Sequence, residues 1–156
     1  MAFASLTPCG TGQRLSVAAT DIAPGDTIQR AVTLTNTGSI NMDASAVRLT
    51  TSATTSSLRD TGGNVLTMTI DKCSVAWTES AFPYTYTCGG TTTTVLASSP
   101  VIGTNVALAN IVTTPATPNH LRVTLTLPTA ADNTYQNQTS VISYSFAGTQ
   151  RAGTNR

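Results

Sequence analysis

The chain has 156 residues, which is enough for one domain with a hydrophobic core of its own. Charged residues make up 10% of the chain and the formal net charge is +1, so the sequence lacks the clustered cationic surface that nucleic-acid binding needs. No stretch approaches the roughly 20 apolar residues of a membrane-spanning helix. Since a nearly neutral surface lacks the self-repulsion that keeps proteins apart, we expect one that permits self-association.

The hydrophobic pattern along the chain is that of short strands. Residues 1–14 have no clear period, and we expect a flexible N-terminal arm there, followed by a β-sandwich domain over 15–156. The clearest strand lies in "TIQRAVTLTNTG", where Ile28, Val32 and Leu34 share one parity and threonines fill the other. Alternation and turn signals predict strands within 14–20, 27–38, 45–51, 65–73, 91–97, 120–128 and 139–150.

The stretch 98–110 has no clear period and is either a connection with a short helical turn or an edge strand. The chain therefore reads as seven or eight short strands, with turns between them and no amphipathic helix of useful length. This pattern predicts an all-β fold: a single-domain, two-sheet sandwich with jelly-roll or Greek-key connections.

Three cysteines allow three single-bridge pairings. Cys73 and Cys88 are close in sequence and bracket "CSVAWTESAFPYTYTC", which looks like a clipped hairpin or loop, so we expect the bridge between them. Cys9 is then either free or paired between chains. A disulfide indicates an oxidising, extracytoplasmic location, and we interpret the start "MAFASL" as an initiator methionine placed on a mature secreted sequence.

The sequence contains no recognisable catalytic constellation. Its one histidine, His120, and its one glutamate, Glu79, are far apart, so the H-E-x-x-H metal motif is missing, as is the G-x-S-x-G elbow of serine hydrolases. Asp21, Asp26 and Asp60 fall in turns, where hydrogen bonding within the turn explains them better than paired-carboxylate catalysis. We expect no enzymatic activity, no metal site and no cofactor.

Three aromatic residues, Trp77, Tyr84 and Tyr86, cluster in the segment between the paired cysteines. Exposed on a β-sandwich, they are candidate stacking residues for a sugar. The alternative is that Trp77 covers the disulfide as a local core. Residue pattern alone leaves both interpretations open.

Several strings resemble the TasA/camelysin family of secreted Gram-positive proteins. "DIAPGDTIQRAVTLTNTGSINM" is similar to the family's turn–strand–turn signature, and "FASLTPCGTGQRLSV" looks like its mature N-terminal stretch. At the end of the chain, "TLP", "ADNTYQ" and the "TQRAG" motif resemble the last two strands of shorter, actinobacterial members, as does the Cys73–Cys88 segment with Trp77. The strings run from one end of the chain to the other, although the middle is weakly matched.

The resemblance implies a jelly-roll sandwich, export by a signal peptide that is then removed, and assembly into extracellular biofilm fibres. In such fibres an N-terminal strand of one subunit completes a sheet of the next. The best-known fibre-forming members are longer and lysine-rich, whereas this chain is short and has Lys72 as its one lysine. Some relatives carry a metalloendopeptidase label, which this sequence does not support because the ligand set is missing.

An N-terminal arm with apolar residues can pair with an unpaired sheet edge of another copy, and such contacts propagate because they do not close. We therefore expect a donated strand made of Ala2, Phe3, Ala4, Ser5, Leu6, Thr7 and Pro8. Phe3 and Leu6 face opposite sides of an ideal strand, and we expect Phe3 to enter the groove. The expected partners are other copies of the chain and a cell-wall or matrix anchor protein. The alternative function is a monomeric secreted surface or carbohydrate-binding module.

Overall fold

The computed structural model describes residues 4–8, 22–53, 64–131 and 141–153. Several sequence expectations fall outside these residues: the strand within 14–20, most of the turn that contains Asp60, and the positions of Phe3, Cys9 and Asp21. Residues 4–8, within the stretch expected to be an arm, form a strand.

The described residues form ten strands and one short 3-10 turn, η1, at Ala44–Ala46. The strands are β1 (Ala4–Pro8), β2 (Thr27–Asn36), β3 (Arg48–Ala53), β4 (Thr67–Cys73), β5 (Trp77–Glu79), β6 (Tyr86–Cys88), β7 (Thr92–Pro100), β8 (Gly103–Ala107), β9 (Pro118–Thr126) and β10 (Ile142–Ala147). They make a five-stranded antiparallel sheet in the order β1-β2-β9-β4-β7, a three-stranded sheet in the order β10-β3-β8, and the hairpin β5-β6.

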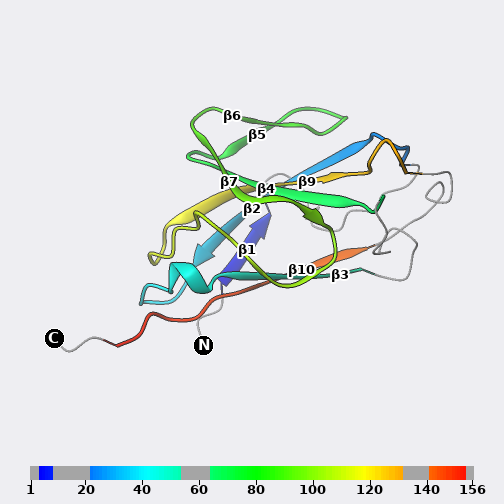
Figure 1. Cartoon of the computed structure of the whole chain (residues 1–156). Helices are drawn as coiled ribbons and strands as arrows, with labels where there is room; N and C mark the ends of the chain where they lie inside the picture. Colours follow the sequence, from blue (N-terminus) through cyan, green and yellow to red (C-terminus); the bar gives the residue numbers. More distant parts are fainter. Residues whose placement is uncertain (1–3, 9–21, 54–63, 132–140, 154–156) are drawn as a thin grey trace.

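The two larger sheets share one hydrophobic core, so the all-β sandwich expected from the sequence is present (Figure 1). We call the face of the five-stranded sheet that meets this core its inner face and the opposite one its outer face. Leu49 of β3, Ile70 of β4 and Leu121 of β9 are fully buried between the sheets. The hairpin β5-β6 lies over the outer face.

One expected strand begins later than the sequence pattern indicated, and a stretch that the sequence left open contains an edge strand. The strand expected within 45–51 begins only at Arg48, because η1 precedes it and Asp43 caps that turn by accepting a hydrogen bond from the Ser45 amide at 2.8 Å. The stretch 98–110, which had no clear period, supplies the end of β7 and the edge strand β8. No residue of β8 is fully buried, so this strand lacks the alternation of buried and exposed residues that marks the inner strands.

Two buried asparagines tie the loops together at the end of the sandwich where β2 stops and β9 starts. Asn119 donates to the carbonyls of Leu34 (3.2 Å) and Val112 (2.8 Å) and accepts from the Val112 amide at 2.7 Å. Asn36 donates to the carbonyls of Ile40 (2.9 Å) and Thr113 (2.8 Å). The loops on either side of these strands are therefore fixed to each other. We call this the loop end of the sandwich and the other, where β2 begins, the β2-start end.

Candidate functional site

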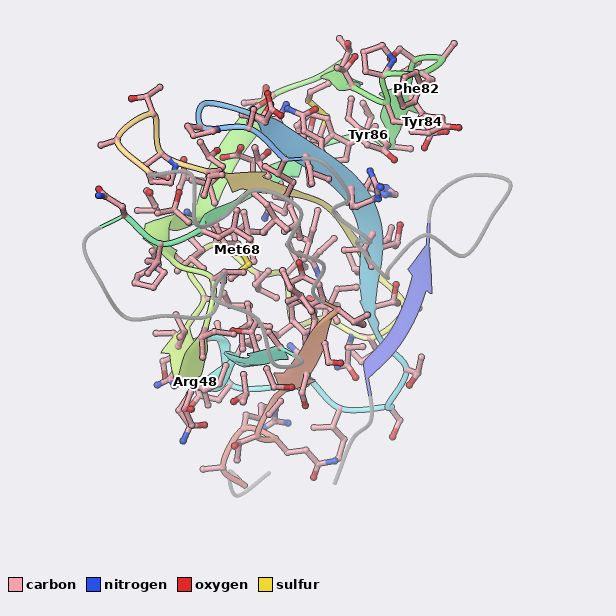
Figure 2. All side chains as sticks on the ribbon, turned by 90° about the vertical axis from the view of Figure 1, so that its right-hand side faces the viewer. Arg48, Met68, Phe82, Tyr84 and Tyr86 are labelled. Carbon is pink, nitrogen blue, oxygen red and sulfur yellow. A yellow bond between two sulfur atoms is a disulfide. The ribbon has the colours of Figure 1, made fainter. Side chains whose placement is uncertain are left out.

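The N-terminal strand β1 lies at an edge of the five-stranded sheet, beside β2 of the same chain (Figure 2). The two strands are antiparallel, with Ala4 opposite Asn36, Leu6 opposite Leu34 and Pro8 opposite Val32. Among the described strands, β1 pairs with β2 alone. It is thus a terminal strand held along one edge, and its removal would uncover the backbone groups of β2 from Val32 to Asn36.

The second feature is the disulfide hairpin, which we define as residues 73–88. Cys73, the last residue of β4, is bonded to Cys88 at the end of β6, with Cα atoms 5.7 Å apart. The expected bridge is therefore present. It fixes the base of the hairpin to the end of β4, from which the hairpin emerges.

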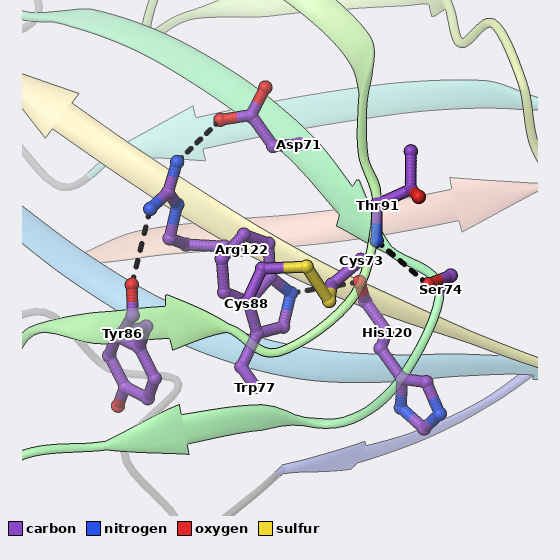
Figure 3. The surroundings of a disulfide bond; sticks show 9 residues. All are labelled: Asp71, Cys73, Ser74, Trp77, Tyr86, Cys88, Thr91, His120 and Arg122. Carbon is purple, nitrogen blue, oxygen red and sulfur yellow. Dashed lines mark hydrogen bonds and ion pairs between the residues drawn. A yellow bond between two sulfur atoms is a disulfide. The ribbon is translucent and has the colours of Figure 1, made fainter.

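A polar and aromatic cluster fastens the hairpin to the outer face of the sheet (Figure 3). The Arg122 guanidinium of β9 lies over the Trp77 indole, with Cζ 4.4 Å from the ring centroid. Its Nη2 donates to Asp71 Oδ2 at 2.8 Å, and its Nη1 donates to the Tyr86 carbonyl at 3.3 Å. The indole Nε1 donates to the His120 carbonyl at 2.9 Å. One cation thus links two strands of the sheet to both strands of the hairpin.

Burial of the hairpin aromatics decides between the two interpretations left open by the sequence. Trp77 and Tyr86 are each 5% exposed and pack with Ala31 and the disulfide as a second, smaller core. The sheet and Arg122 cover their faces, which leaves little surface on Trp77 and Tyr86 for stacking on a sugar. Trp77 is the local core of the disulfide segment. Tyr84 is half-buried and keeps part of its surface in solvent.

The exposed aromatic of this hairpin is a residue that the sequence analysis did not single out. Phe82 is 83% exposed and packs edge-to-face on Tyr84, with ring centroids 5.8 Å apart and an interplanar angle of 85°. Ser80 orders this tip: its hydroxyl accepts from the Thr85 amide at 3.0 Å, and its amide donates to the Thr85 carbonyl at 2.9 Å. The tip is therefore a hydrogen-bonded loop that presents Phe82 to solvent.

The titrating groups of the hairpin are arranged as structural partners. The Tyr86 hydroxyl donates to Glu79 Oε2 at 2.5 Å. Burial raises the pKa of Tyr86 to about 12, and the hydrogen bond to the Glu79 carboxylate acts in the same direction.

His120 is half-buried, with Nδ1 3.4 Å from Thr33 Oγ1. Asp26 accepts from the Ala23 amide at 2.8 Å, as expected of a turn residue.

Within the part of the chain that the structure describes, no three His, Cys, Asp or Glu side chains gather in a way that could hold a metal ion. The same residues include no helix long and apolar enough to cross a membrane.

The sequence analysis missed the residues that hold the hairpin and the loops in place. Arg122 and Asp71 share the parity of the threonines in their strands, so the sequence pattern marks both as surface residues. They become partners only because the register of β4 and β9 places them opposite each other. Asn36 and Asn119 are 1% exposed, although asparagine at a strand end is usually a turn residue. The available signal was parity, since Asn119 shares the alternation of Leu121 and Val123.

Comparison of the chain with protein-family models and with curated proteins gives no match.

Proposed function

We propose that this protein is a structural subunit of an extracellular biofilm-matrix or pilus-like fibre, which assembles head-to-tail by exchange of its N-terminal strand. The observation that carries the proposal is the pairing of β1 with β2. β1 is the first described strand, lies at a sheet edge and pairs along one side, so it can be replaced by the same strand from another copy.

Exchange between copies keeps the backbone hydrogen bonds of the β1–β2 pair and changes only the chain that supplies β1. An identical strand from a neighbour would take the same register, with Leu6 opposite Leu34. Because each copy would donate at one place and accept at another, the contact is heterologous and extends into a filament unless the rotation closes it into a ring. The net charge of +1 supports such assembly, since copies repel one another little.

A secreted location belongs to the same proposal, and the Cys73–Cys88 disulfide is compatible with it. The proposal includes no catalytic role and no cofactor. It takes as partners other copies of the chain and an anchor protein of the cell wall or matrix.

A pair of engineered cysteines tests strand exchange directly. Ser5 and Thr35 are opposite each other in the β1–β2 pair, and opposed strand residues lie within disulfide distance. The variant S5C/T35C, with Cys9→Ser to remove the third thiol, would be oxidised once as dilute monomer and once after filaments have formed. We expect an intramolecular bond in the first sample and a ladder of covalent multimers on a non-reducing gel in the second.

Filaments whose cysteines bond only within one chain would show that assembly uses another contact. The strand-exchange part of the proposal would then be wrong. If electron microscopy of the wild-type protein shows no filaments at any concentration, the fibre function itself is wrong. The control S5C with Cys9→Ser has one engineered thiol and should give no ladder beyond dimer.

A further inference from the structure

The hairpin tip, which we define as Phe82–Tyr84, is an aromatic surface held out into solvent by a rigid support (Figure 2). Phe82 is 83% exposed, whereas the residues behind it are fixed by the disulfide, by Arg122 and by the hydrogen bonds of Ser80. Exposed aromatics on ordered scaffolds are frequent anchors of protein contacts, because little conformational entropy is lost when they are buried. The tip therefore has the properties of a docking element.

A second exposed apolar surface lies at the loop end of the sandwich. Ile40 is 44% exposed and Val112 is 37% exposed. The loops that carry them are fixed to each other, because Asn36 donates to the carbonyls of Ile40 and of Thr113, the neighbour of Val112. Arg151 joins the same surface, since its amide donates to the Asn41 carbonyl at 3.2 Å. We call Ile40, Val112 and Arg151 the loop-end patch.

The tip and the loop-end patch lie toward opposite ends of the molecule. The hairpin leaves the sheet at Cys73, near the loop end, and runs back over the outer face, so that the Tyr86 amide reaches Gln29 Oε1 at 3.0 Å, near the start of β2. The tip continues in that direction, away from the loops that carry Ile40 and Val112, as Figure 1 shows.

The described charges are divided in the same way. Asp26 and Glu79 lie toward the β2-start end together with Arg30, which gives −2 + 1 = −1 there, and the Arg122–Asp71 pair between the two ends is neutral. The loop end carries Arg48, Lys72, whose ammonium group donates to the Asn110 carbonyl, and Arg151, against one acid, Asp43, which gives +3 − 1 = +2. The described part of the chain is therefore acidic toward the hairpin tip and basic at the loop-end patch. Two copies placed end to end bring opposite charges together.

We propose that the hairpin tip of one copy docks on the loop-end patch of a second copy, with Phe82 against Ile40 and Val112 and with Glu79 facing Arg151. This contact rests on the proposed fibre function and adds to strand exchange a second interface between neighbouring subunits. Its occupant is another copy of this chain, because both complementary surfaces belong to it and lie toward opposite ends. The contact repeats from copy to copy in one direction.

Photo-crosslinking of the full-length protein tests the contact. Phe82 is replaced by benzoylphenylalanine, labelled and unlabelled protein are mixed, and crosslinked peptides are identified by mass spectrometry. We expect links between chains from position 82 to the segments around Ile40, Val112 or Arg151. The matched control carries the same photoreactive residue at Thr87, which is exposed on the same hairpin but away from the tip, and it should give no such links.

Links from position 82 to other surfaces, or no links between chains at high protein concentration, would overturn the contact. If position 82 gives no link between chains, but a neutral polysaccharide shields the tip from solvent, the docking contact would be overturned in favour of glycan binding. Strand exchange is judged separately, by the Ser5–Thr35 cysteine ladder. If wild-type protein forms no filaments, the fibre function fails, but position 82 should still crosslink to the loop-end patch at high concentration.

Charge exchange supplies the second measurement. Glu79→Arg and Arg151→Glu should each raise the protein concentration needed for assembly several-fold, and the double variant should restore it because the pair is re-formed with reversed sign. Phe82→Ser should raise that concentration by about tenfold, as loss of a contact anchor does. Glu79→Gln controls for the hydrogen bond to Tyr86. A double variant no better than the two single ones would contradict the proposed pairing of Glu79 with Arg151.

Discussion

Arg122 lies over the Trp77 indole at 4.4 Å, and through this contact a residue of the sheet holds the disulfide hairpin, although Trp77 lies 45 positions earlier in the chain. The guanidinium also bonds to Asp71 and to the Tyr86 carbonyl, so it serves the sheet and the hairpin together. Because both members of the Arg122–Asp71 ion pair are about one-fifth exposed, water screens the pair only in part. The hairpin is consequently a packed part of the fold.

Arg122→Ala should destabilise the protein by about 1–3 kcal/mol, since it removes a cation–π contact and leaves Asp71 without its partner. The change should also increase the exposure of Trp77, the chain's one tryptophan, to solvent. Urea unfolding and tryptophan emission measure the two effects. Arg151→Ala, at an exposed arginine, is the matched control and should leave both unchanged. Equal stability of the two variants would contradict the bridging role of Arg122.

Replacing both bridge cysteines, as Cys73→Ser with Cys88→Ser, should cost about 3 kcal/mol, the chain-entropy estimate for a loop of this length. The two cysteines are separated by 15 positions and their loop contains only the hairpin. We therefore expect faster amide hydrogen exchange in residues 74–88, while the buried strands β4 and β9 remain protected. Loss of protection throughout the sandwich would instead mean that the hairpin and the main core unfold as one unit.

Asn119→Ala should destabilise the protein by about 1–3 kcal/mol, because the Val112 amide and the carbonyls of Leu34 and Val112 lose the side chain that pairs with them. Chemical denaturation gives the value. The control is Asn41→Ala, at an exposed asparagine of the loop end, which should change stability little. Similar losses for both variants would show that the loop end tolerates no substitution, whatever the burial.

Stability should fall as the pH rises from about 10 to about 12. Burial raises the pKa of Tyr86 and of Tyr144 to about 12 in the folded chain, above the ordinary value of 10. The folded state therefore favours the neutral phenols: their contribution is complete below pH 10 and is lost as the pH passes through the folded pKa. Urea midpoints measured at a series of pH values should decline less steeply in Tyr86→Phe with Tyr144→Phe than in the wild type. An unchanged slope would contradict this assignment.

Local pattern was sufficient for the strands that have one buried face. In β2, β4 and β9, most residues of one parity are apolar and buried, as with Val32 and Leu34 or Leu121 and Val123, so alternation alone located these strands. The Cys73–Cys88 bond was likewise accessible to sequence, since two cysteines that bracket a short segment can meet without help from the rest of the fold. In the stretch 98–110, alternation is too weak to locate the end of β7 and the strand β8.

Only the tertiary structure decided which residues on the outer face of the sheet are covered. Ala31 alternates with threonines and reads as a surface position, yet it is 6% exposed because the hairpin lies over it. Trp77 and Tyr86 were equally compatible with a sugar-binding surface until Arg122 and Asp71, from strands distant in sequence, were placed beside them. Burial on the second face of a sheet depends on what packs there. Alternation along a strand shows only that its two faces differ. Whether the second face is also buried depends on contacts between segments that are distant in the sequence.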